Sequence, residues 1–581
     1  MKTSSQGCSY YVARAVVLAF TTVLAETASA TTATCSIDAL NALQIKYLDV
    51  TSATLVASAN GVPEYCQISG NVTTHGEGVG KGSAGVQISL PSNWNGKFLF
   101  MGGGGFDGVI FGIPNPADLI KGYAMAGTDS GHMTNPAETE PSNDASWSVI
   151  SLGVPDKIKL ADYFYRSRHD VVVATKELIK SYYGDPIHHA YFSGCSNGGH
   201  EAVKQAMRYP DDFEGVIAGD PWIDQPGNEL WNLRNIKELL NAWIPPSAFP
   251  AIQKAVYAQC DAADGVVDGL IQNPAKCAFN PDTLVPSVLS QQQSNALKVY
   301  LSAVRDETGT LVFPGSSVAG IGAATESNFP SVTGLAVNEV PIFASLATAV
   351  PAPYPTGPQP WGSTFTSPSN WQLAFGVIGD FGYRDLNANL VGDLVIDSNG
   401  RARTDAVDLV YRRAEPGLAT DPEDLRRFIG MGHKLLIYDG YADSTLNPYK
   451  TILFYEDLAQ ESGGYQKTQE NVRLFMFPDM EHCGLGGVGL QPVDTLTPLE
   501  NWVEQGLAPE FLMASHTTGP ESTGLNNRTM PVCKFPEQAR YNGSGNLNDA
   551  SSWSCPPNQG LLEVGPNGIA AGLGKGEDGD E

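Results

Sequence analysis

A serine between two glycines is the first feature of the chain that could carry out chemistry. Ser196 lies in the segment Gly194–Gly198 (GCSNG), which fits the pattern G-x-S-x-G. This pattern places a serine on a sharp turn between a strand and a helix, where the glycines avoid a collision and the hydroxyl is exposed. The apolar run 190–193 and the helical pattern 199–208 flank the segment, as the pattern requires. We therefore expect Ser196 to be a nucleophile for acyl transfer.

Two loops further along the chain carry the acid and the base that such a serine needs. Proteins with this turn order their catalytic residues as Ser, then Asp or Glu, then His. Asp443 follows the strand-like run 434–438, and His482 follows the run 472–477. We expect His482 to take the proton of Ser196, and Asp443 to hold the imidazole tautomer and stabilise the imidazolium.

Three other side chains compete for these two roles. Asp439 is nearer to its strand and could be the acid, although we interpret it as a turn residue. His433 precedes the acid strand and is therefore in the wrong order. His132 lies in the segment DSGH, where we expect a structural loop residue.

Backbone N–H groups from two segments could stabilise the oxyanion that such a reaction forms. Asn197, the residue after the nucleophile, is expected to supply one donor. The glycine run Gly102–Gly105 follows the strand-like run 97–101, and we expect Gly103 and Gly104 to supply the other. No Lys-Ser/Thr pair follows these glycines, which argues against a phosphate-binding loop.

The cysteine count favours disulfides. Cys8 lies in the N-terminal leader, which leaves an even number of the nine cysteines for an oxidising compartment. The sequence alone does not determine how these pair. Local spacing suggests three pairs and leaves two cysteines for each other: Cys35–Cys66, Cys260–Cys277, Cys533–Cys555 and the remainder Cys195–Cys483.

The remaining pair has a bearing on the catalytic residues. Cys195 directly precedes Ser196, and Cys483 directly follows His482. If the serine and the histidine are in contact, their neighbours are close enough to be bridged. Cysteine spacing and the expected order of catalytic residues therefore indicate the same pair.

A short acidic loop could bind a cation. Three aspartates, with glycines that can bend the chain, offer oxygen ligands of the kind that Ca²⁺ prefers. The spacing is not that of an EF-hand, and the alternative is a solvated acidic turn. Because Cys260 and Cys277 would clasp the segment, we expect an ordered loop with a structural Ca²⁺. Its ligands would be Asp261, Asp264, Val266, Asp268 and Leu270, with the carbonyl groups of the two apolar residues.

The elements that position these residues form a regular pattern. Strand-like apolar runs alternate with helical patterns over residues 97–219, and strand-like runs return at 434–438 and 472–477. This alternation predicts a parallel sheet covered by helices on both faces. With the nucleophile turn, it predicts an α/β fold of the α/β-hydrolase type.

The region between the two groups of strands has a different composition. Residues 222–430 are rich in Pro, Ser and Thr and have little periodicity. We interpret them as a large inserted lid domain over the carboxyl ends of the strands, where ligands bind in open α/β sheets. The expected organisation is a catalytic domain of residues 31–221 and 431–560, a lid domain of residues 222–430 with the calcium loop, and a disordered acidic tail of residues 561–581.

The N-terminus has the pattern of a secretory signal peptide at residues 1–30. Lys2 and Arg14 give a positive start, the run 15–24 is apolar, and residues 28–30 form a small-residue cleavage site. The apolar run is far shorter than the ~20 residues that a membrane-spanning helix needs. We therefore expect a secreted protein, extracellular or periplasmic.

Composition excludes some partners. The chain has 35 basic and 62 acidic residues, and its formal net charge of -27 repels nucleic acids and anionic membranes. A hydrophobic share of 42% and a charged share of 17% are typical of a globular protein. We expect a small-molecule substrate and no nucleic-acid or membrane partner. Export would also allow glycans at the sequons of Asn71, Asn527 and Asn542.

These motifs resemble the tannase and feruloyl esterase family over most of the chain, from about Cys35 to Cys555. In that family a disulfide links the neighbours of the catalytic serine and histidine. The residues that match this pattern are Cys195, Ser196, Asp443, His482 and Cys483.

The same resemblance has further implications. The acidic loop resembles the family's calcium loop in the lid, and the segments 531–533 and 539–545 resemble its closing segment. Family members include gallate esterases, hydroxycinnamate esterases and a hydrolase of a terephthalate monoester. The resemblance implies hydrolysis of phenolic or aromatic carboxylic esters through an acyl-enzyme.

Two other functions fit parts of the sequence. A serine peptidase of related fold shares the nucleophile motif, but such enzymes usually carry a propeller or a helical cap, and no blade-like repeat is present. The intact order of the catalytic residues argues against a catalytically inactive binding protein.

For the esterase, aromatic residues of the lid could line an acyl pocket, although each of them taken singly is more typical of a core. These residues are Trp361, Trp371, Phe375 and Phe381.

Overall fold

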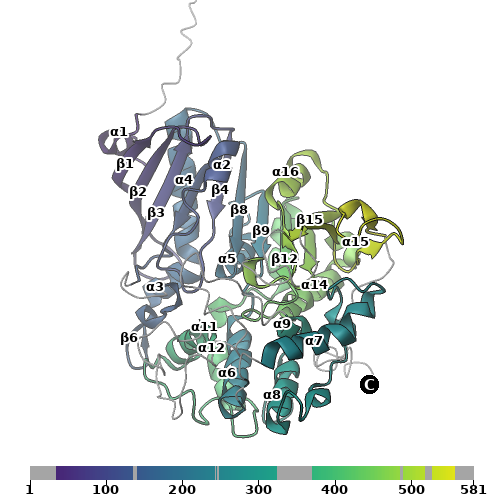
Figure 1. Ribbon diagram of the computed structural model, residues 1–581. Coiled ribbons are helices and arrows are strands. Elements are labelled where there is room, and N and C mark those ends of the chain that lie inside the picture. Colours follow the sequence, from purple (N-terminus) through teal and green to yellow (C-terminus); the bar gives the residue numbers. More distant parts are fainter. Residues whose placement is uncertain are drawn as a thin grey trace, which may run out of the picture.

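The computed structural model describes residues 34–134, 141–242, 244, 248–322, 369–484, 489–516 and 527–556. The expected signal peptide at residues 1–30, the tail at 561–581 and Trp361 lie outside these residues. Figure 1 shows a large sheet flanked by helices, with a further group of helices beyond one end of its strands.

A mixed sheet forms the centre of the fold. In the described residues its strands lie in the order β1-β2-β3-β5-β4-β8-β9-β12-β13. Neighbours from β1 to β5 pair antiparallel, and neighbours from β5 to β13 pair parallel. The strands are β1 (Leu48–Val56), β2 (Tyr65–Thr74), β3 (Gly82–Pro91), β4 (Lys97–Met101), β5 (Ala124–Thr128), β8 (His189–Cys195), β9 (Gly215–Gly219), β12 (Lys434–Gly440) and β13 (Val472–Phe477).

The prediction of a parallel sheet is confirmed from β5 to β13, and β1 to β3, which precede the region that the prediction covered, pair antiparallel. Every residue of β5, β9 and β13 is buried, as expected for parallel strands covered on both faces. Burial along β2 alternates instead, as in an antiparallel strand with one covered face. The N-terminal strands therefore extend the sheet as an antiparallel edge.

Helices cover both faces of the sheet. Phe98 and Phe192 belong to the core on one face, and Leu99 and Tyr191 belong to the core on the other, because successive strand residues point to opposite faces. The first face is covered by α4 (Ser167–Tyr183), α5 (Asn197–Arg208) and α14 (Pro448–Ser462), and the second by α2 (Pro116–Lys121) and α16 (Leu496–Gln505).

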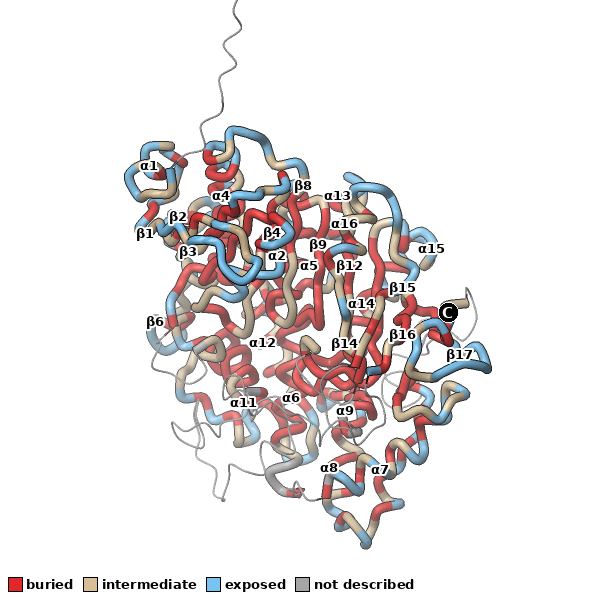
Figure 2. The backbone as a smooth tube through the Cα atoms, turned by 45° about the horizontal axis from the view of Figure 1, so that its top comes forward, coloured by how far each residue is buried: buried red, intermediate tan, exposed pale blue. Residues whose placement is uncertain are grey.

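In its described part, the chain between β9 and β12 adds no strand to the large sheet. Most of its helices and a short hairpin contribute to a second hydrophobic core, which lies beyond the strand ends in Figure 1. Figure 2 shows that much of this region is buried. The elements are α6 (Gln225–Asn241), α7 (Phe249–Cys260), α8 (Gln291–Leu301), β10 (Val304–Arg305), β11 (Leu311–Phe313), α9 (Val318–Gly322), α11 (Ser369–Ala374), α12 (Thr404–Arg413) and α13 (Arg426–Gly430).

Smaller elements complete the described chain. Among the described residues, no helix has both the length and the apolar character needed to cross a membrane. The minor sheets and short helices are α1 (Ile37–Asn41), β6 (Val149–Ser151), β7 (Val154–Pro155), α3 (Lys157–Ala161), α15 (Tyr465–Thr468), β14 (Gln491–Pro492), β15 (Phe511–His516), β16 (Arg528–Cys533), β17 (Arg540–Tyr541) and β18 (Trp553–Ser554).

The described cysteines form four disulfides, and their pairing is the one that local spacing suggests. The Cα–Cα distances are 5.7, 5.9, 5.2 and 5.6 Å, within the usual range for a bridge. The pairs are Cys35–Cys66, Cys195–Cys483, Cys260–Cys277 and Cys533–Cys555.

Candidate active site

The nucleophile turn joins β8 to α5. Ser196 has φ 65° and ψ -126°, a strained conformation that projects the side chain at the turn. Its N–H donates to the carbonyl of Gly219 at 3.0 Å. A Cβ added to Gly194 would lie 2.4 Å from the carbonyl oxygen of Gly198, so this tight turn needs glycine at that position.

An acid–base pair lies above this turn. The Nδ1 atom of His482 is 2.6 Å from Oδ2 of Asp443. The other oxygen of Asp443 accepts the N–H groups of Thr445 and Leu446, each at 2.8 Å. Because the carboxylate faces Nδ1, the proton of the neutral ring belongs on Nδ1 and Nε2 is the basic nitrogen. Asp443 therefore stands where the acid is expected, on the loop after β12.

The competing side chains have other contacts. His132 stacks on Trp147 with ring centroids 3.9 Å apart, and burial lowers its pKa to about 3. The Nδ1 atom of His433 is 3.0 Å from the carbonyl oxygen of Pro210. Asp439 is buried beside Asp220, a neighbour described below. The imidazole of His482 instead faces the carboxylate of Asp443.

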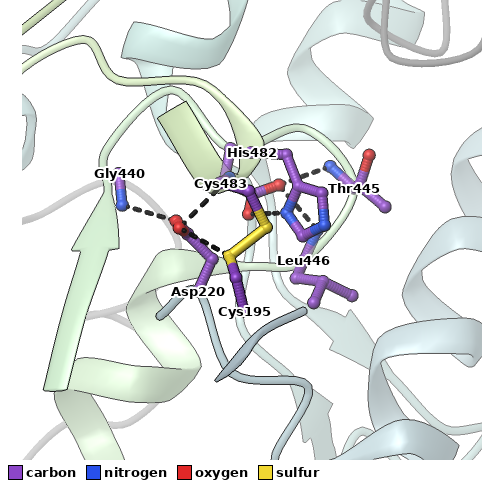
Figure 3. The surroundings of a disulfide bond; sticks show 8 residues. Cys195, Asp220, Gly440, Thr445, Leu446, His482 and Cys483 are labelled. Atoms are coloured by element: carbon purple, nitrogen blue, oxygen red, sulfur yellow. Dashed lines mark hydrogen bonds and ion pairs between the residues drawn. A yellow bond between two sulfur atoms is a disulfide. The ribbon is translucent and has the colours of Figure 1, made fainter. Parts of the chain in front are cut away.

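A disulfide links the nucleophile turn to the histidine loop. Cys195 and Cys483 are 288 residues apart in sequence and 5.9 Å apart at Cα. Figure 3 shows this bond beside the imidazole of His482. The bridge therefore connects the residue before Ser196 to the residue after His482, as the two sequence arguments predict.

The glycine loop lies directly on the nucleophile turn. A Cβ on Gly102 would be 2.8 Å from Cα of Gly198, so the two backbones are in contact. The N–H of Gly103 donates to Oε2 of Glu201 at 2.9 Å. The expectation that Gly103 is an oxyanion donor is therefore wrong for this conformation, because its N–H already has a partner.

Two other N–H groups remain as candidate oxyanion donors. Within the described residues, the N–H of Gly104 has no hydrogen-bond acceptor. Asn197 is the first residue of α5, and an N–H in the first turn of a helix has no partner within that helix. Gly104 and Asn197 therefore retain the donors that an oxyanion requires.

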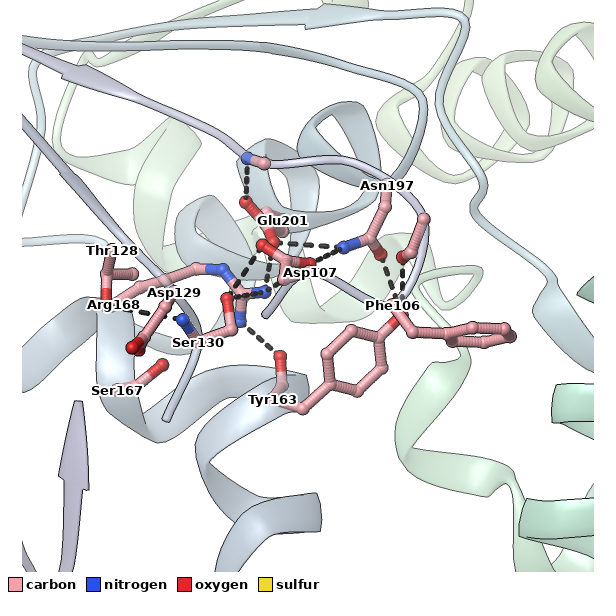
Figure 4. A network of polar contacts seen from close by, with 12 residues as sticks. Phe106, Asp107, Thr128, Asp129, Ser130, Tyr163, Ser167, Arg168, Asn197 and Glu201 are labelled. Carbon is pink, nitrogen blue, oxygen red and sulfur yellow. Dashed lines mark hydrogen bonds and ion pairs between the residues drawn. The ribbon is translucent and has the colours of Figure 1, made fainter. Parts of the chain in front are cut away.

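A buried charge network supports the glycine loop from below (Figure 4). Arg168 forms ion pairs with Glu201 and, at 3.8 Å, with Asp107. The side-chain amide of Asn197 donates to Glu201 at 3.0 Å and to Asp107 at 2.5 Å. Burial, followed by the charge of Glu201, raises the pKa of Asp107 well above its usual value.

Sequence reasoning did not identify this network, since its members are far apart along the chain. Asp107, Arg168 and Glu201 have at most 1% of their surface exposed. The available signal was the position of Glu201, a charged residue on the inner side of α5, one turn after Ser196. Buried charges of this kind occur where they are paired.

Ser196 and His482 line the same cavity, which has a volume of about 450 Å³. The glycine loop and the two cysteines of the Cys195–Cys483 disulfide also line the cavity. Its largest apolar lining residues are Met101, Phe111, Trp222, Leu373, Tyr438 and Leu446. The site is therefore an apolar pocket with a few polar groups at one end, as is usual for small-molecule sites.

Of the lid aromatics considered from the sequence, the three that the structure describes do not line this cavity. Trp371, Phe375 and Phe381 have 1 to 3% of their surface exposed and belong to the lid core. Trp222 and Leu373 line the pocket instead. Single aromatic residues lie in cores more often than in pockets, and these three residues lie in a core.

The acidic loop lies after α7 and contains mutually repelling carboxylates. Asp264 has a buried Oδ2 atom without a hydrogen-bond partner. Burial, with the nearby charges of Asp268 and Asp261, raises the pKa of Asp264 to about 7. These oxygen donors fit a hard cation, which would neutralise their charge.

Other contacts already engage part of this loop. Asp261 accepts the N–H groups of Asp268 and Gly269 at 3.0 and 3.1 Å. Asp268 forms an ion pair with Arg528 at 2.7 Å. In the described structure, the oxygens of these three carboxylates do not all lie within 4.8 Å of one another. A bound cation would therefore draw Asp261, Asp264 and Asp268 closer together.

Comparison with known proteins agrees with this geometry. The family model described as tannase and feruloyl esterase matches residues 66–556. A probable feruloyl esterase of Arthroderma benhamiae is 30% identical over 517 residues, covering 85% of this chain and 86% of that protein. A mono(2-hydroxyethyl) terephthalate hydrolase of Piscinibacter sakaiensis is 26% identical over 558 residues, covering 87% of each chain.

Solved structures share the fold. Feruloyl esterase B from Aspergillus oryzae aligns with a TM-score of 0.68 at 21% identity, covering 90% of this chain and 99% of that chain. Tannin acyl hydrolase from Aspergillus niger aligns with a TM-score of 0.66 at 20% identity, covering 91% and 97%. These alignments are consistent with the α/β-hydrolase fold predicted from the sequence. The chain belongs to the tannase and feruloyl esterase family and is a carboxylic ester hydrolase.

Proposed function

We propose that this protein is a serine esterase that cleaves esters of phenolic or other aromatic carboxylic acids through an acyl-enzyme. The observation that carries the proposal is the 2.6 Å contact between His482 and Asp443, on a loop bridged to the turn of Ser196. The relatives named as feruloyl esterase and terephthalate monoester hydrolase supply the substrate class.

The first half of the reaction forms the acyl-enzyme. Oγ of Ser196 attacks the ester carbonyl carbon while its proton passes to Nε2 of His482. Asp443 holds Nδ1–H and stabilises the imidazolium that forms. The tetrahedral intermediate collapses when the bond to the alcohol oxygen breaks and His482 donates its proton to that oxygen.

The second half releases the acid. A water molecule gives a proton to His482 and attacks the acyl carbon, and the bond to Oγ of Ser196 then breaks with return of the proton. In both halves a negative charge develops on the carbonyl oxygen. The N–H groups of Gly104 and Asn197 are the donors that we assign to that oxygen.

The pocket suits a flat aromatic acyl group. Trp222, Leu373 and Leu446 give it an apolar wall contributed by the chain that follows β9, by α11 and by the acid loop. An aromatic ring buried against such a wall is stabilised by the hydrophobic effect. Ser142 and Asn143 also line the cavity and offer polar contacts to ring hydroxyl groups.

The test is a panel of methyl gallate, methyl ferulate, methyl caffeate and mono(2-hydroxyethyl) terephthalate. We expect the wild type to release acid from at least one ester, and Ser196→Ala to lose that activity by at least about 1,000-fold. A fluorophosphonate should label Ser196 and leave the variant unlabelled. Failure on every ester, or a label on another residue, would contradict the proposal. Cleavage of peptides instead would favour the peptidase alternative.

We also infer that the protein is exported. Four disulfides need an oxidising compartment, and the N-terminal sequence has the pattern of a signal peptide. The three sequon asparagines are exposed, so glycans could be accommodated in a host that adds them: Asn71, Asn527 and Asn542. N-terminal sequencing of the mature protein from culture medium or periplasm tests this inference, and a retained leader would contradict it.

A further inference from the structure

Three buried carboxylates meet behind the histidine loop. Asp220 directly follows β9, Asp439 lies near the end of β12, and Asp443 is the acid of the proposed triad. Each has 4% or less of its surface exposed. One oxygen from each lies within 4.8 Å of the others. The proposed mechanism uses Asp443 and gives no role to the other two.

Asp220 contacts both loops that carry the acid and the base. Its Oδ1 atom accepts the N–H of Gly440 at 2.9 Å, where the acid loop begins. Its Oδ2 atom accepts the N–H of Cys483 at 3.1 Å, next to His482. Figure 3 shows the carboxylate between these two donors and beside the disulfide.

The backbone of Asp220 also has a fixed contact and an unusual conformation. Its N–H donates to the carbonyl of Tyr438 at 2.8 Å. Its φ angle is 35°, in the left-handed region that few residues other than glycine adopt. Surrounding contacts must maintain such a conformation, and strained residues of this kind cluster at functional sites.

In the part of the chain that the structure describes, no basic side chain forms an ion pair with Asp220 or Asp439. One carboxylate oxygen of each lies within 4.8 Å of the other, and Oδ1 of Asp439 is buried without a hydrogen-bond partner. Burial and the neighbouring carboxylates raise the pKa of Asp439 to about 7 and that of Asp220 well above its usual value. Two carboxyl groups so close cannot both ionise easily, which favours a state in which the pair shares one proton.

The other titratable groups around this pair are known. Tyr438 faces it from β12, Tyr441 approaches Asp439 from the segment just after β12, and Asp443 faces the pair from the acid loop with His482 beyond. The sulfur atoms of Cys195 and Cys483 are bonded to each other and do not titrate. A second ionisation of the pair would therefore add its charge directly behind Asp443.

We propose that Asp220 is a positioning residue for the catalytic base. It clamps the acid loop and the histidine loop through Gly440 and Cys483, and the proton that it shares with Asp439 keeps a further negative charge away from Asp443. This inference rests on the proposed serine mechanism. The disulfide ties the two loops at one point, and the bond from Cys483 N–H fixes the orientation of the peptide adjoining His482.

The test separates the clamp from the shared proton with two variants. Asp220→Asn retains one acceptor oxygen and turns an NH₂ group toward one of the two N–H donors. We expect kcat to fall about tenfold with KM within twofold, since a small misplacement of the base lowers the rate of the chemical step. Asp439→Asn leaves both acceptor oxygens of Asp220, and we expect kcat within about threefold of the wild type.

Both variants should also change the pH profile. We expect the wild-type rate to decline at alkaline pH as the pair loses its last proton, and neither variant should show this decline. The rate constant for Ser196 inactivation by a fluorophosphonate, measured from pH 5 to 10, reports this without a chosen substrate. Asp405→Asn, an exposed aspartate with 73% of its side chain accessible, is the matched control and should behave as the wild type.

Three results would overturn the inference: a wild-type profile without an alkaline decline, an unchanged decline in Asp439→Asn, or an Asp220→Asn variant with wild-type kcat. If Asp220→Asn does not fold, the profile of Asp439→Asn decides the matter. If the reagent does not label Ser196 in the wild type, the proposed function fails instead.

Discussion

Oε2 of Glu201 accepts the backbone N–H of Gly103 at 2.9 Å, which joins the glycine loop to the helix that begins at the nucleophile. Oε1 of the same side chain pairs with Arg168, so one buried carboxylate holds two elements together. The contact turns the Gly103 N–H away from the role of oxyanion donor. It also gives the loop a fixed position relative to Ser196.

Replacement of Glu201 by glutamine should uncouple this loop. The glutamine can accept only through one oxygen, and its NH₂ group would face either Gly103 N–H or Arg168. We expect kcat to fall about 100-fold, comparable to the loss of one oxyanion donor, with a small change in KM. Steady-state kinetics on the best ester of the panel measure this effect.

The control for that experiment is Glu177→Gln on the exposed side of α4. It makes the same chemical change away from the site and should leave both constants unchanged. A Glu201→Gln enzyme with the kcat of the wild type would mean that the loop holds its position without this contact.

Two adjacent glycines should tolerate alanine differently. A Cβ on Gly103 would lie 1.9 Å from Oδ2 of the buried Asp107, whereas a Cβ on Gly104 would first meet Phe111 at 3.6 Å. We expect Gly103→Ala to lower the free energy of unfolding by about 1–3 kcal/mol, as overpacking does. Gly104→Ala should remain within about 0.5 kcal/mol of the wild type.

Urea denaturation of the two alanine variants provides the comparison. Equal stability of the two would show that Asp107 and the loop can move apart at little cost. A change in the denatured state would alter the m-value of urea unfolding, so thermal melts of the same samples provide an independent measure of stability.

Loss of the Cys195–Cys483 disulfide should affect both stability and catalysis. The bridge spans 288 residues, and closure of so long a loop is worth about 5–6 kcal/mol in the chain-entropy account. We expect the double serine variant to lose stability of this order and to lose kcat, because the neighbours of Ser196 and His482 are no longer bridged. Denaturation and initial rates measure the two effects.

The Cys260–Cys277 disulfide offers a matched comparison, since it spans 17 residues and lies away from the cavity. Its removal should cost about 3 kcal/mol at most and leave kcat at the wild-type level. If the two double variants lose kcat equally, the longer bridge has no special role in holding the base.

Calcium should stabilise the chain through the acidic loop. A ligand at 100 times its Kd adds about 2.7 kcal/mol to the free energy of unfolding, which corresponds to a rise in Tm of about 2–4 °C for a chain of this size. We expect this rise when Ca²⁺ replaces EDTA, because Asp264 offers a buried oxygen without a partner. Differential scanning calorimetry with and without the metal tests it.

Asp264→Asn should abolish the response to Ca²⁺, while Asp282→Asn, an aspartate outside the loop that pairs with Lys298, should keep it. An identical melting temperature in EDTA and Ca²⁺ for the wild type would contradict a structural calcium at this loop.

Local patterns along the chain were enough to predict several features of this protein. The strand, turn and helix around Ser196 are determined by residues close to it in sequence. For this reason the apolar run and the glycines that follow it were enough to predict these elements. The order of Ser196, Asp443 and His482 and the spacing of the cysteines needed no coordinates either. The α/β class followed from the alternation of runs, which reflects periods of two and 3.6 residues.

Tertiary structure alone decided what surrounds these residues. Asp220 reaches Cys483 across 263 positions, and Glu201 reaches Gly103 across 98, so no local pattern could pair them. The antiparallel edge, the partner of the Gly103 N–H and the choice of Trp222 over Trp371 at the pocket have the same origin. Which face of an element is buried depends on what packs against it, and that is settled only when distant segments meet.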